Sequence, residues 1–251
     1  MGSTDLDVRL PGGAAGWGDV GARAVIRLSV THLESLRYDR DVFERDGMED
    51  LIADLTRAKP PTAKMEAGKA LAAFLEHAAP GGGPIDSIMR DGWCFDFSKL
   101  DAQMPAPAIT ELKARKVIET GSGQVLLTGK ADGVSGLFLN DEKLVDRFDA
   151  EKYFESLQWR AYLWMLQARS FTYNVFVGKI DEEEKRVQVY ELHPVTFYTY
   201  PDIDLDVCAA VDDLAGIIRR GRETSQALRE AFPELPDELE EMRERPARSG
   251  R

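Results

Sequence analysis

The sequence is poor in cysteine, with only Cys94 and Cys208 among its 251 residues. These two lie far apart in the sequence and form no Cys-x-x-Cys pair. The four thiolate ligands of an iron–sulfur cluster or of a structural zinc site are therefore not available, and we expect neither. One disulfide is compatible with this count, but a reducing cytosolic compartment is the interpretation that the cysteine usage favours.

Long apolar runs are also missing. No stretch reaches the roughly 18 apolar residues that a membrane-spanning helix requires. The first residues include Asp5 and Asp7 and contain no apolar segment of the signal-peptide type. We therefore expect a soluble, intracellular protein that has no membrane partner.

Positive charge is the third deficit. The 32 Lys and Arg residues stand against 44 Asp and Glu residues, which leaves a formal net charge of −12. This balance excludes a uniformly basic coat for nucleic acid, although it allows a local basic groove. Candidates for the rim of such a groove are Lys113, Arg115, Lys116, Lys130, Arg147 and Lys152.

The composition that remains is that of a globular chain, with 43% apolar residues and enough length to bury a sizeable core. Residues 1–24, which include Pro11-Gly12-Gly13, are predicted to be a mobile leader. Residues 25–232 are predicted to form a single domain. Residues 233–251 are predicted to be a charged tail that frays.

Hydrophobic periodicity predicts helices at both ends of this domain and strands between them. Thr31 is expected to cap the first helix, because Glu34 follows at the capping-box spacing. The expected helices are 31–36 onward, 46–59, a segment from about 62, 150–169 and 204–232, and the expected strands are 27–30, 111–119, 124–135, 137–145, 171–180 and 186–191. This order predicts a mixed α/β fold with a central mixed β-sheet flanked by helices.

Four residues of the central strands carry the most informative pattern: Asp132, then Asp141, Glu142 and Lys143. Side chains alternate along a strand, so Asp141 and Lys143 share one face and Glu142 points to the other. A hairpin between the two strands would place Asp132 beside Asp141. Adjacent carboxylates repel each other unless a cation lies between them, and oxygen ligands of this kind suit Mg²⁺ or Mn²⁺.

A structural interpretation competes with this one. In a chain with 30% charged residues, such a pattern often arises by chance. Asp132 would then cap a turn, and Asp141 to Lys143 would be a solvated strand end.

Two helical stripes extend the pattern, and each also has an alternative interpretation without a functional role. Gly68, Ala72 and Glu76 recur every four residues, so small residues would bring this stripe close to a sheet and direct the Glu76 carboxylate toward it. The alternative is an exposed Glu76 near the helix end. Gln158 and Tyr162 are also four apart, on an aromatic helix where a glutamine needs polar partners. Its alternative is a buried glutamine bonded to backbone.

The series G-K-A-D, D-E-K and Q-W-R-A-Y, in this order, resembles the PD-(D/E)XK nuclease superfamily. The similarity is to its lambda-exonuclease and RecB-type branch, especially the single-domain versions that phages encode. Further similarity lies in the opening R-L-S-V-T-H-L-E and in the stretch from Phe148 to Gln158. The resemblance covers about residues 25–200, and the order of its short motifs is its specific part.

The resemblance implies a role for each matching position. Asp132 matches the metal-binding aspartate, Asp141 the acid of the (D/E)xK pair and Lys143 the catalytic lysine. The backbone carbonyl of Glu142 would be a further metal ligand. The remaining implied site residues are Gln158 and Tyr162, which match the QxxxY element, and Glu76, which falls where a helix acid is expected.

Two departures from the family pattern concern the metal. Many RecB-type members carry a histidine four residues after the helix glycine, where this chain has Ala72, so a metal ligand from this helix depends on Glu76. The iron–sulfur cysteines of some relatives are absent. Glu111 resembles an acid that is often found at the start of the first strand, and a surface charge is the alternative.

The resemblance implies a Mg²⁺- or Mn²⁺-dependent deoxyribonuclease in which a cation activates the attacking water. Its leading version is an exonuclease of recombination or phage DNA processing, located in the bacterial host cytoplasm. DNA would be its substrate, a single-strand annealing or other recombination protein its partner, and a homo-oligomer its assembly. The rivals are a catalytically inactive nuclease fold that binds a protein or nucleic acid, such as an anti-defence or regulatory factor, and an RNA or nucleotide hydrolase on the same fold.

Overall fold

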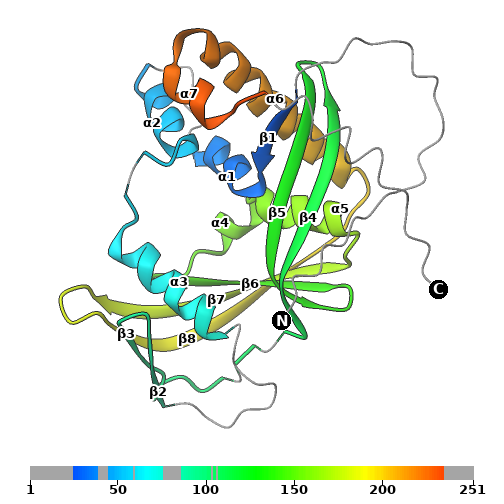
Figure 1. Ribbon diagram of the computed structural model, residues 1–251. Coiled ribbons are helices and arrows are strands. Elements are labelled where there is room, and N and C mark those ends of the chain that lie inside the picture. Colours follow the sequence, from blue (N-terminus) through cyan, green and yellow to red (C-terminus); the bar gives the residue numbers. More distant parts are fainter. Residues whose placement is uncertain are drawn as a thin grey trace, which may run out of the picture. The chain divides into compact units, whose positions relative to one another are not determined.

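The computed structural model describes residues 25–38, 45–58, 60–75, 86–102, 104–105 and 107–234. Within these ranges the chain forms eight strands and seven helices (Figure 1). In chain order they are β1 (Ile26–Ser29), α1 (Val30–Tyr38), α2 (Arg45–Leu55), α3 (Ala63–Leu75), β2 (Ser87–Arg90), β3 (Trp93–Asp96), β4 (Ile109–Thr120), β5 (Gly123–Ser135), β6 (Phe138–Val145), α4 (Ala150–Phe154), α5 (Leu157–Leu166), β7 (Ser170–Asp181), β8 (Arg186–Tyr198), α6 (Ile203–Thr224) and α7 (Gln226–Ala231).

The described strands are hydrogen-bonded in the order β1-β5-β6-β7-β8-β3-β2, and β4 pairs with β5. The β1–β5, β6–β7 and β3–β8 pairs are parallel, whereas β5–β6, β7–β8 and β2–β3 are antiparallel. Helix α3 packs against β6, and α5 packs against β7. The predicted fold class, mixed α/β with a central mixed sheet and flanking helices, is therefore confirmed.

The chain divides into two compact units, each assembled from separated segments. Among the described residues, the first unit comprises 60–114 and 130–203, and the second comprises 25–58, 115–129 and 204–234. The predicted leader 1–24 and residues 235–251 of the predicted tail lie outside the described residues. The single domain over 25–232 stays a prediction.

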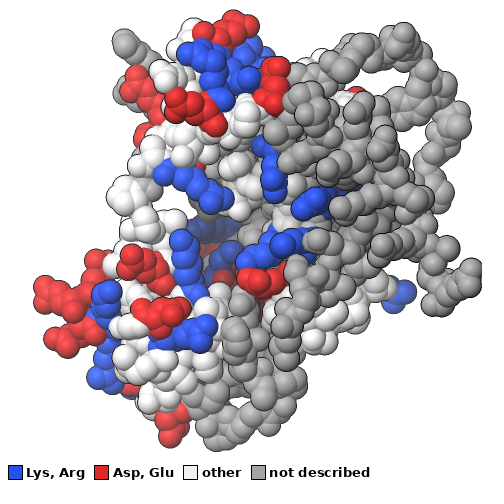
Figure 2. Space-filling model, in the orientation of Figure 1, with Lys and Arg blue, Asp and Glu red and all other residues white. Residues whose placement is uncertain are grey.

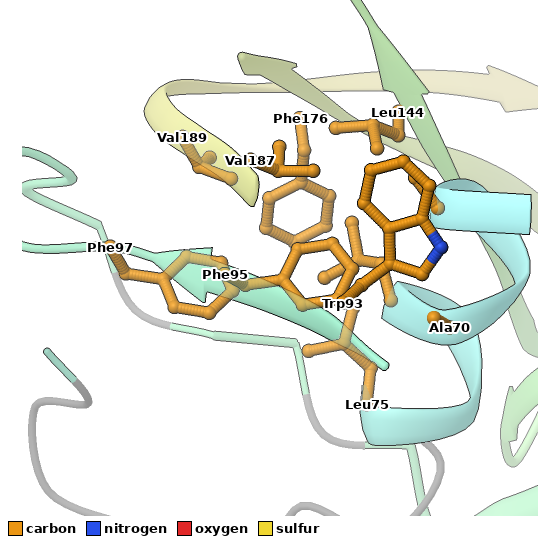
Figure 3. Packing of buried hydrophobic residues seen from close by; sticks show 11 residues of the cluster. Ala70, Leu75, Trp93, Phe95, Phe97, Leu144, Phe176, Val187 and Val189 are labelled. Carbon is orange, nitrogen blue, oxygen red and sulfur yellow. The ribbon is translucent and has the colours of Figure 1, made fainter. Parts of the chain in front are cut away.

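The core of the first unit forms around β3 and α3. Alternation along β3 buries Trp93 and Phe95, and helical spacing on α3 buries Ala70, Leu71 and Leu75. Figure 3 shows these side chains packed together, with further apolar residues of β6, β7 and β8 completing the cluster. Burial of each large apolar side chain stabilises the fold by about 1.5–3 kcal/mol.

The second unit is built on β1 and the first half of β5. The β1 residues Ile26 and Leu28 are buried, as are Val125 and Leu127 opposite them in the parallel register. Helix α6 contributes a buried apolar stripe at helical spacing: Val207, Val211, Leu214, Ala215 and Ile218. This unit therefore has an interior of its own.

The sequence predicted most elements but misplaced several helix boundaries. Ser29, not Thr31, caps α1, because its Oγ accepts from the His32 amide at 3.3 Å while the His32 ring accepts from the Ser29 amide at 3.2 Å. Burial and the charge of Arg57 lower the pKa of His32 to about 4, which fits this acceptor role. The predicted helices 150–169 and 204–232 are each divided in two, because Ser156 and Ser225 start new helices as N-caps.

Strands β2 and β3 were not predicted from the sequence. They form a hairpin whose turn residues, Asp91 and Gly92, have φ angles of 48° and 81°. An Asp-Gly pair between two short apolar stretches is a strong hairpin signal, so this element was predictable. Strand β8 also runs to Tyr198, well beyond the predicted end at 191.

None of the described helices is both long and apolar enough to cross a membrane.

Candidate active site

The β5–β6 hairpin brings the two central aspartates together within the first unit. Its antiparallel register pairs Gly133 with Asn140 and Val134 with Leu139, so the next row places Asp132 opposite Asp141. Asp141 is buried, with 3% of its surface exposed. The hairpin turn at Gly136, whose φ is 65°, is short enough to fix this register.

The two carboxyl groups perturb each other strongly. Burial and the adjacent Asp141 carboxylate raise the pKa of Asp132 to about 8, with a hydrogen bond between the two side chains adding to the shift and Lys143 opposing it. In the absence of a cation the pair therefore holds a proton near neutral pH. Such a buried pair of acids costs stability, which makes it a candidate functional site.

Lys143 completes the charged face of β6. Its Nζ forms an ion pair with Asp141 Oδ2, and it lies 5.7 Å from the centre of the Tyr173 ring. The side chain of Lys143 is 36% exposed and that of Asp141 only 5%, so the pair reaches from the interior toward solvent. A half-exposed ammonium beside two carboxylates is well placed to meet an anionic substrate.

The two QxxxY residues contact neighbouring strands. Gln158 Nε2 donates to Asp141 Oδ1 at 2.7 Å. The Tyr162 hydroxyl accepts from the Lys130 amide at 3.0 Å and donates to the Lys130 carbonyl at 2.8 Å, so it is bound to the β5 backbone two residues before Asp132. Burial raises the pKa of this hydroxyl, which keeps it protonated. Gln158 thus contacts a candidate metal-binding carboxylate directly, and Tyr162 acts on the strand that carries the other.

Tyr173 and Ser156, which were not predicted from the sequence to be site residues, adjoin this site. Tyr173 is 1% exposed and stands opposite Asp141 in the parallel β6–β7 register. Its hydroxyl lies 2.7 Å from Ser156 Oγ and 3.4 Å from Gln158 Oε1. No sequence motif marks Tyr173, because its place depends on a pairing between strands that a helical segment separates.

The side chain of Glu142 lies on the opposite face of β6. Asn140 Nδ2 donates to its Oε1 at 2.6 Å, and Asn174 Nδ2 donates to the same oxygen at 3.4 Å. Burial and the charge of Asp141 raise the pKa of Glu142, and these amide bonds oppose the rise. A metal ligand at this residue would therefore come from its backbone carbonyl and not from its carboxylate.

The predicted helix stripe is only partly described. Gly68 and Ala72 are half-buried, while the buried face of α3 is formed by Ala67, Ala70, Leu71 and Leu75. A Cβ added at Gly68 would meet nothing within 4 Å among the described residues, so the expectation that this glycine allows close packing is wrong. Glu76 lies outside the described residues.

Glu111 and His193 have partners outside this site. Glu111 is exposed and forms an ion pair with Lys130, which fits the surface-charge interpretation. His193 lies beside Glu191 and stacks on Phe148 with ring centres 4.3 Å apart. Figure 2 shows a separate gathering of acidic side chains at the β7–β8 turn, where Asp181 to Glu184 are exposed.

The donor set of the Asp132–Asp141 pair fits a small divalent cation. Asp141 Oδ2 is buried and accepts no hydrogen bond from the described residues, although the Lys143 ammonium lies beside it. Two opposed carboxylates with one such oxygen are suitable ligands for Mg²⁺ or Mn²⁺, which retain several waters. The described residues contain no cluster of three or more His, Cys, Asp or Glu side chains that could hold a metal. Further ligands would thus be backbone carbonyls, waters or substrate.

Comparisons with known proteins find distant structural similarity only. No family model matches the sequence. No curated protein matches it either. A crystal structure of a protein designated SSO0001 matches with a TM-score of 0.42 and 14% identity over 76% of each chain.

Two crystal structures of the alkaline exonuclease LHK-Exo, from Laribacter hongkongensis, also match. One has a TM-score of 0.38 and 12% identity, and each covers 78% of this chain and 92% of the exonuclease. The other, a complex with dAMP, has a TM-score of 0.37 and 11% identity. Because these similarities are distant, what the site can do has to follow from this chain's own residues.

Proposed function

We propose that this protein is a Mg²⁺- or Mn²⁺-dependent DNA nuclease that hydrolyses phosphodiester bonds. One observation carries the proposal: two opposed, largely buried carboxyl groups, Asp132 and Asp141, lie beside the Lys143 ammonium, and Gln158 donates to the Asp141 carboxylate. Carboxylates for a cation and an ammonium for phosphate are the parts that phosphodiester hydrolysis requires.

The chain's own residues would divide the work in the following way. Asp132 and Asp141 would hold the cation, with the Glu142 carbonyl as a third ligand. Lys143 would bind the scissile phosphate, because its ammonium is partly exposed, and would neutralise charge that develops on phosphate oxygens during attack. Gln158 would keep Asp141 oriented, and Tyr162 would hold β5 in place through the Lys130 backbone.

The bound cation would supply positive charge to the phosphate and lower the pKa of the attacking water. Its arrival would also displace the proton that the Asp132–Asp141 pair holds near neutral pH. Metal binding should therefore release protons. Glu76 stays a proposed ligand from the segment after α3.

The finer version of the proposal is an exonuclease of phage DNA recombination or processing. It rests on the motif series shared with the lambda-exonuclease and RecB-type branch of the PD-(D/E)XK nucleases. A single-strand annealing or other recombination protein would be its partner, with a homo-oligomer as the working assembly and the host cytoplasm as its place of action. The predicted basic residues would line the path of the DNA.

The direct test is degradation of end-labelled linear DNA and of closed circular DNA in Mg²⁺ or Mn²⁺, with wild type beside Asp141→Asn. We expect loss of linear DNA that EDTA abolishes and that Asp141→Asn reduces by at least about 1,000-fold. Asp146→Asn is the matched control, because this carboxylate follows β6 directly but is exposed and pairs with Lys64.

Each outcome separates the alternatives. Cutting of the circle as well as the linear DNA would establish an endonuclease in place of an exonuclease. Equal activity of wild type and Asp141→Asn would move the active site elsewhere. Folded protein that binds DNA but degrades neither DNA nor RNA would overturn the enzyme and favour the nuclease fold kept for binding.

A further inference from the structure

Strand β5 carries a glycine, Gly133, directly after the candidate metal-binding residue Asp132. A glycine inside a strand weakens the strand, and it often marks a place where another group comes close to the backbone. Gly133 pairs with Asn140 of β6, in the row next to Asp132 and Asp141. Whatever requires a glycine here therefore lies one residue from both carboxylates.

The group that comes close is the side chain of Asn140. A Cβ added at Gly133 would lie 2.3 Å from Asn140 Nδ2, 2.4 Å from its Oδ1 and 2.6 Å from its Cγ. All three distances are much shorter than a van der Waals contact between heavy atoms, which is about 3.5–4.0 Å. Because Cγ is among these atoms, rotation of the amide about its bond to Cβ cannot make room for a side chain at Gly133.

Asn140 is held over Gly133 by the Glu142 carboxylate. Its Nδ2 donates to Glu142 Oε1 at 2.6 Å, whereas Asn174 Nδ2 donates to the same oxygen at 3.4 Å. Glu142 is partly buried, and a carboxylate that is removed from water needs such donors. A side chain at Gly133 would therefore either break the shorter of these bonds or push β5 and β6 apart.

The distance between β5 and β6 in turn sets the distance between the two acids on the opposite face. Asp132 and Asp141 form the next row after Gly133 and Asn140, and side chains alternate between the faces of a strand. Mg²⁺ binds oxygen at about 2.0–2.1 Å in a strict octahedron, and Ca²⁺ at about 2.3–2.6 Å in a flexible shell. A shift of about 0.5 Å between the strands would therefore change which cation the carboxylates suit.

We infer that Gly133 and Asn140 determine cation specificity, because their close contact holds the two candidate metal-binding carboxylates at the separation that suits Mg²⁺ in preference to Ca²⁺. Neither residue would touch the cation, so both are positioning residues that act through the two strands. The inference deepens the proposed function and rests on it for the presence of a cation. The contact itself is a property of the chain alone.

Cation specificity is tested by calorimetric titration of Mg²⁺ and of Ca²⁺ into the full-length protein. We expect Gly133→Ala to weaken Mg²⁺ binding by about 10–100-fold, as substitutions behind a metal ligand do, and to weaken Ca²⁺ binding less. Asn140→Ala in the same chain removes all three atoms that the new Cβ would meet, so the double variant should regain Mg²⁺ binding. Gly68→Ala is the matched control, since a Cβ there meets nothing within 4 Å among the described residues, and it should change neither affinity.

The contact is tested without a cation by urea denaturation in EDTA. We expect Gly133→Ala to lower the denaturation midpoint and the addition of Asn140→Ala to raise it again, because the clash is relieved. If Gly133→Ala does not fold, the double variant still should, and its Mg²⁺ binding is then compared with that of Asn140→Ala alone. A double variant that is no more stable than Gly133→Ala, or that does not fold either, would overturn the contact.

Failure of the inference and failure of the proposed function give different results. If wild type and Gly133→Ala bind Mg²⁺ equally well, the amide has turned aside without moving the strands, which overturns the inference and leaves the nuclease in place. Equal losses for Mg²⁺ and Ca²⁺ also overturn it, because a merely structural defect does not change the ratio of the two affinities. Wild type that binds neither cation overturns the metal site of the proposed nuclease, and the stability of the double variant still decides whether Gly133 and Asn140 are in contact.

Discussion

The two faces of strand β6 hold charge in opposite ways. On one face, Asp141 and Lys143 stand beside Asp132, and burial there raises the pKa of Asp132 to about 8. On the other face, Glu142 receives two amide hydrogen bonds, and Leu144 joins the apolar cluster under α3. The second face follows the ordinary rule that buried polar groups are satisfied. On the first face, Asp141 Oδ2 is buried and accepts no hydrogen bond from the described residues. Such an exception is expected where side chains are retained for chemistry.

Between the two faces, the largest expected difference comes from neutralising one charge on each: Lys143 on the first and Glu142 on the second. We expect Lys143→Met to lower the rate of DNA hydrolysis by about 10²–10³-fold, because its ammonium would face the phosphate. Glu142→Gln should change the rate by less than about threefold, because Asn140 and Asn174 can donate to the side-chain oxygen of a glutamine as they do to Glu142. Both rates are measured on the same labelled DNA. Similar losses in the two variants would remove the distinction between the faces.

Stability should show the reverse ranking. Leu144→Ala leaves a cavity beside Trp93 and Phe176 and should lower the free energy of unfolding by about 2–4 kcal/mol, as core truncations do. Lys143→Met should lower it by less than Leu144→Ala does, because the lysine is partly exposed and the Asp132–Asp141 pair can take up a proton when the ammonium is lost. Urea denaturation at fixed pH in EDTA gives both values. A Leu144→Ala protein as stable as wild type would show that the apolar face of β6 does not contribute to stability.

The last expected effect is a slope of stability with pH, smaller per pH unit than the cost of Leu144→Ala. The folded-state pKa of Asp132 is raised to about 8 from 3.8, so the folded state binds the proton more tightly between these values. Stability of the metal-free protein should therefore fall as pH rises from about 4 to about 8, by at most about 1.4 kcal/mol per pH unit.

The contribution of Asp132 is isolated by subtraction. His32, with its pKa lowered to about 4, acts in the opposite sense, because its contribution is lost as pH falls from 6.5. Since His32 is present in both proteins, the difference between wild type and Asp132→Asn in EDTA cancels it. We expect the stability of Asp132→Asn to increase relative to that of wild type as the pH rises. A difference independent of pH would show that the two carboxyl groups do not share a proton.

Local pattern allowed much of the fold and part of the site to be predicted. The adjacency of Asp132 and Asp141 followed from a short hairpin, in which the turn alone fixes the register. The position of Gln158 and Tyr162 on one face of a helix followed from their spacing. The division of the aromatic helix was missed, because Ser156 was not recognised as an N-cap within an apolar stretch.

Contacts between segments that are distant in the sequence could not be predicted from local pattern. The partners of Gln158 depend on the parallel pairing of β6 with β7, which brings Tyr173 opposite Asp141. The partners of Glu142 depend on the same pairing, since Asn174 comes from β7. No local propensity specifies which strands become neighbours in a mixed sheet.

The residues described around the carboxyl pair all come from one continuous stretch of chain, from Lys130 to Asn174. Closing a short loop costs less entropy than closing a long one, so this stretch can order early during folding. The β3–β8 pairing joins Cys94 to Arg186 across a far longer separation and is expected to form later. The charged pair would then be assembled before the apolar cluster under α3 is complete.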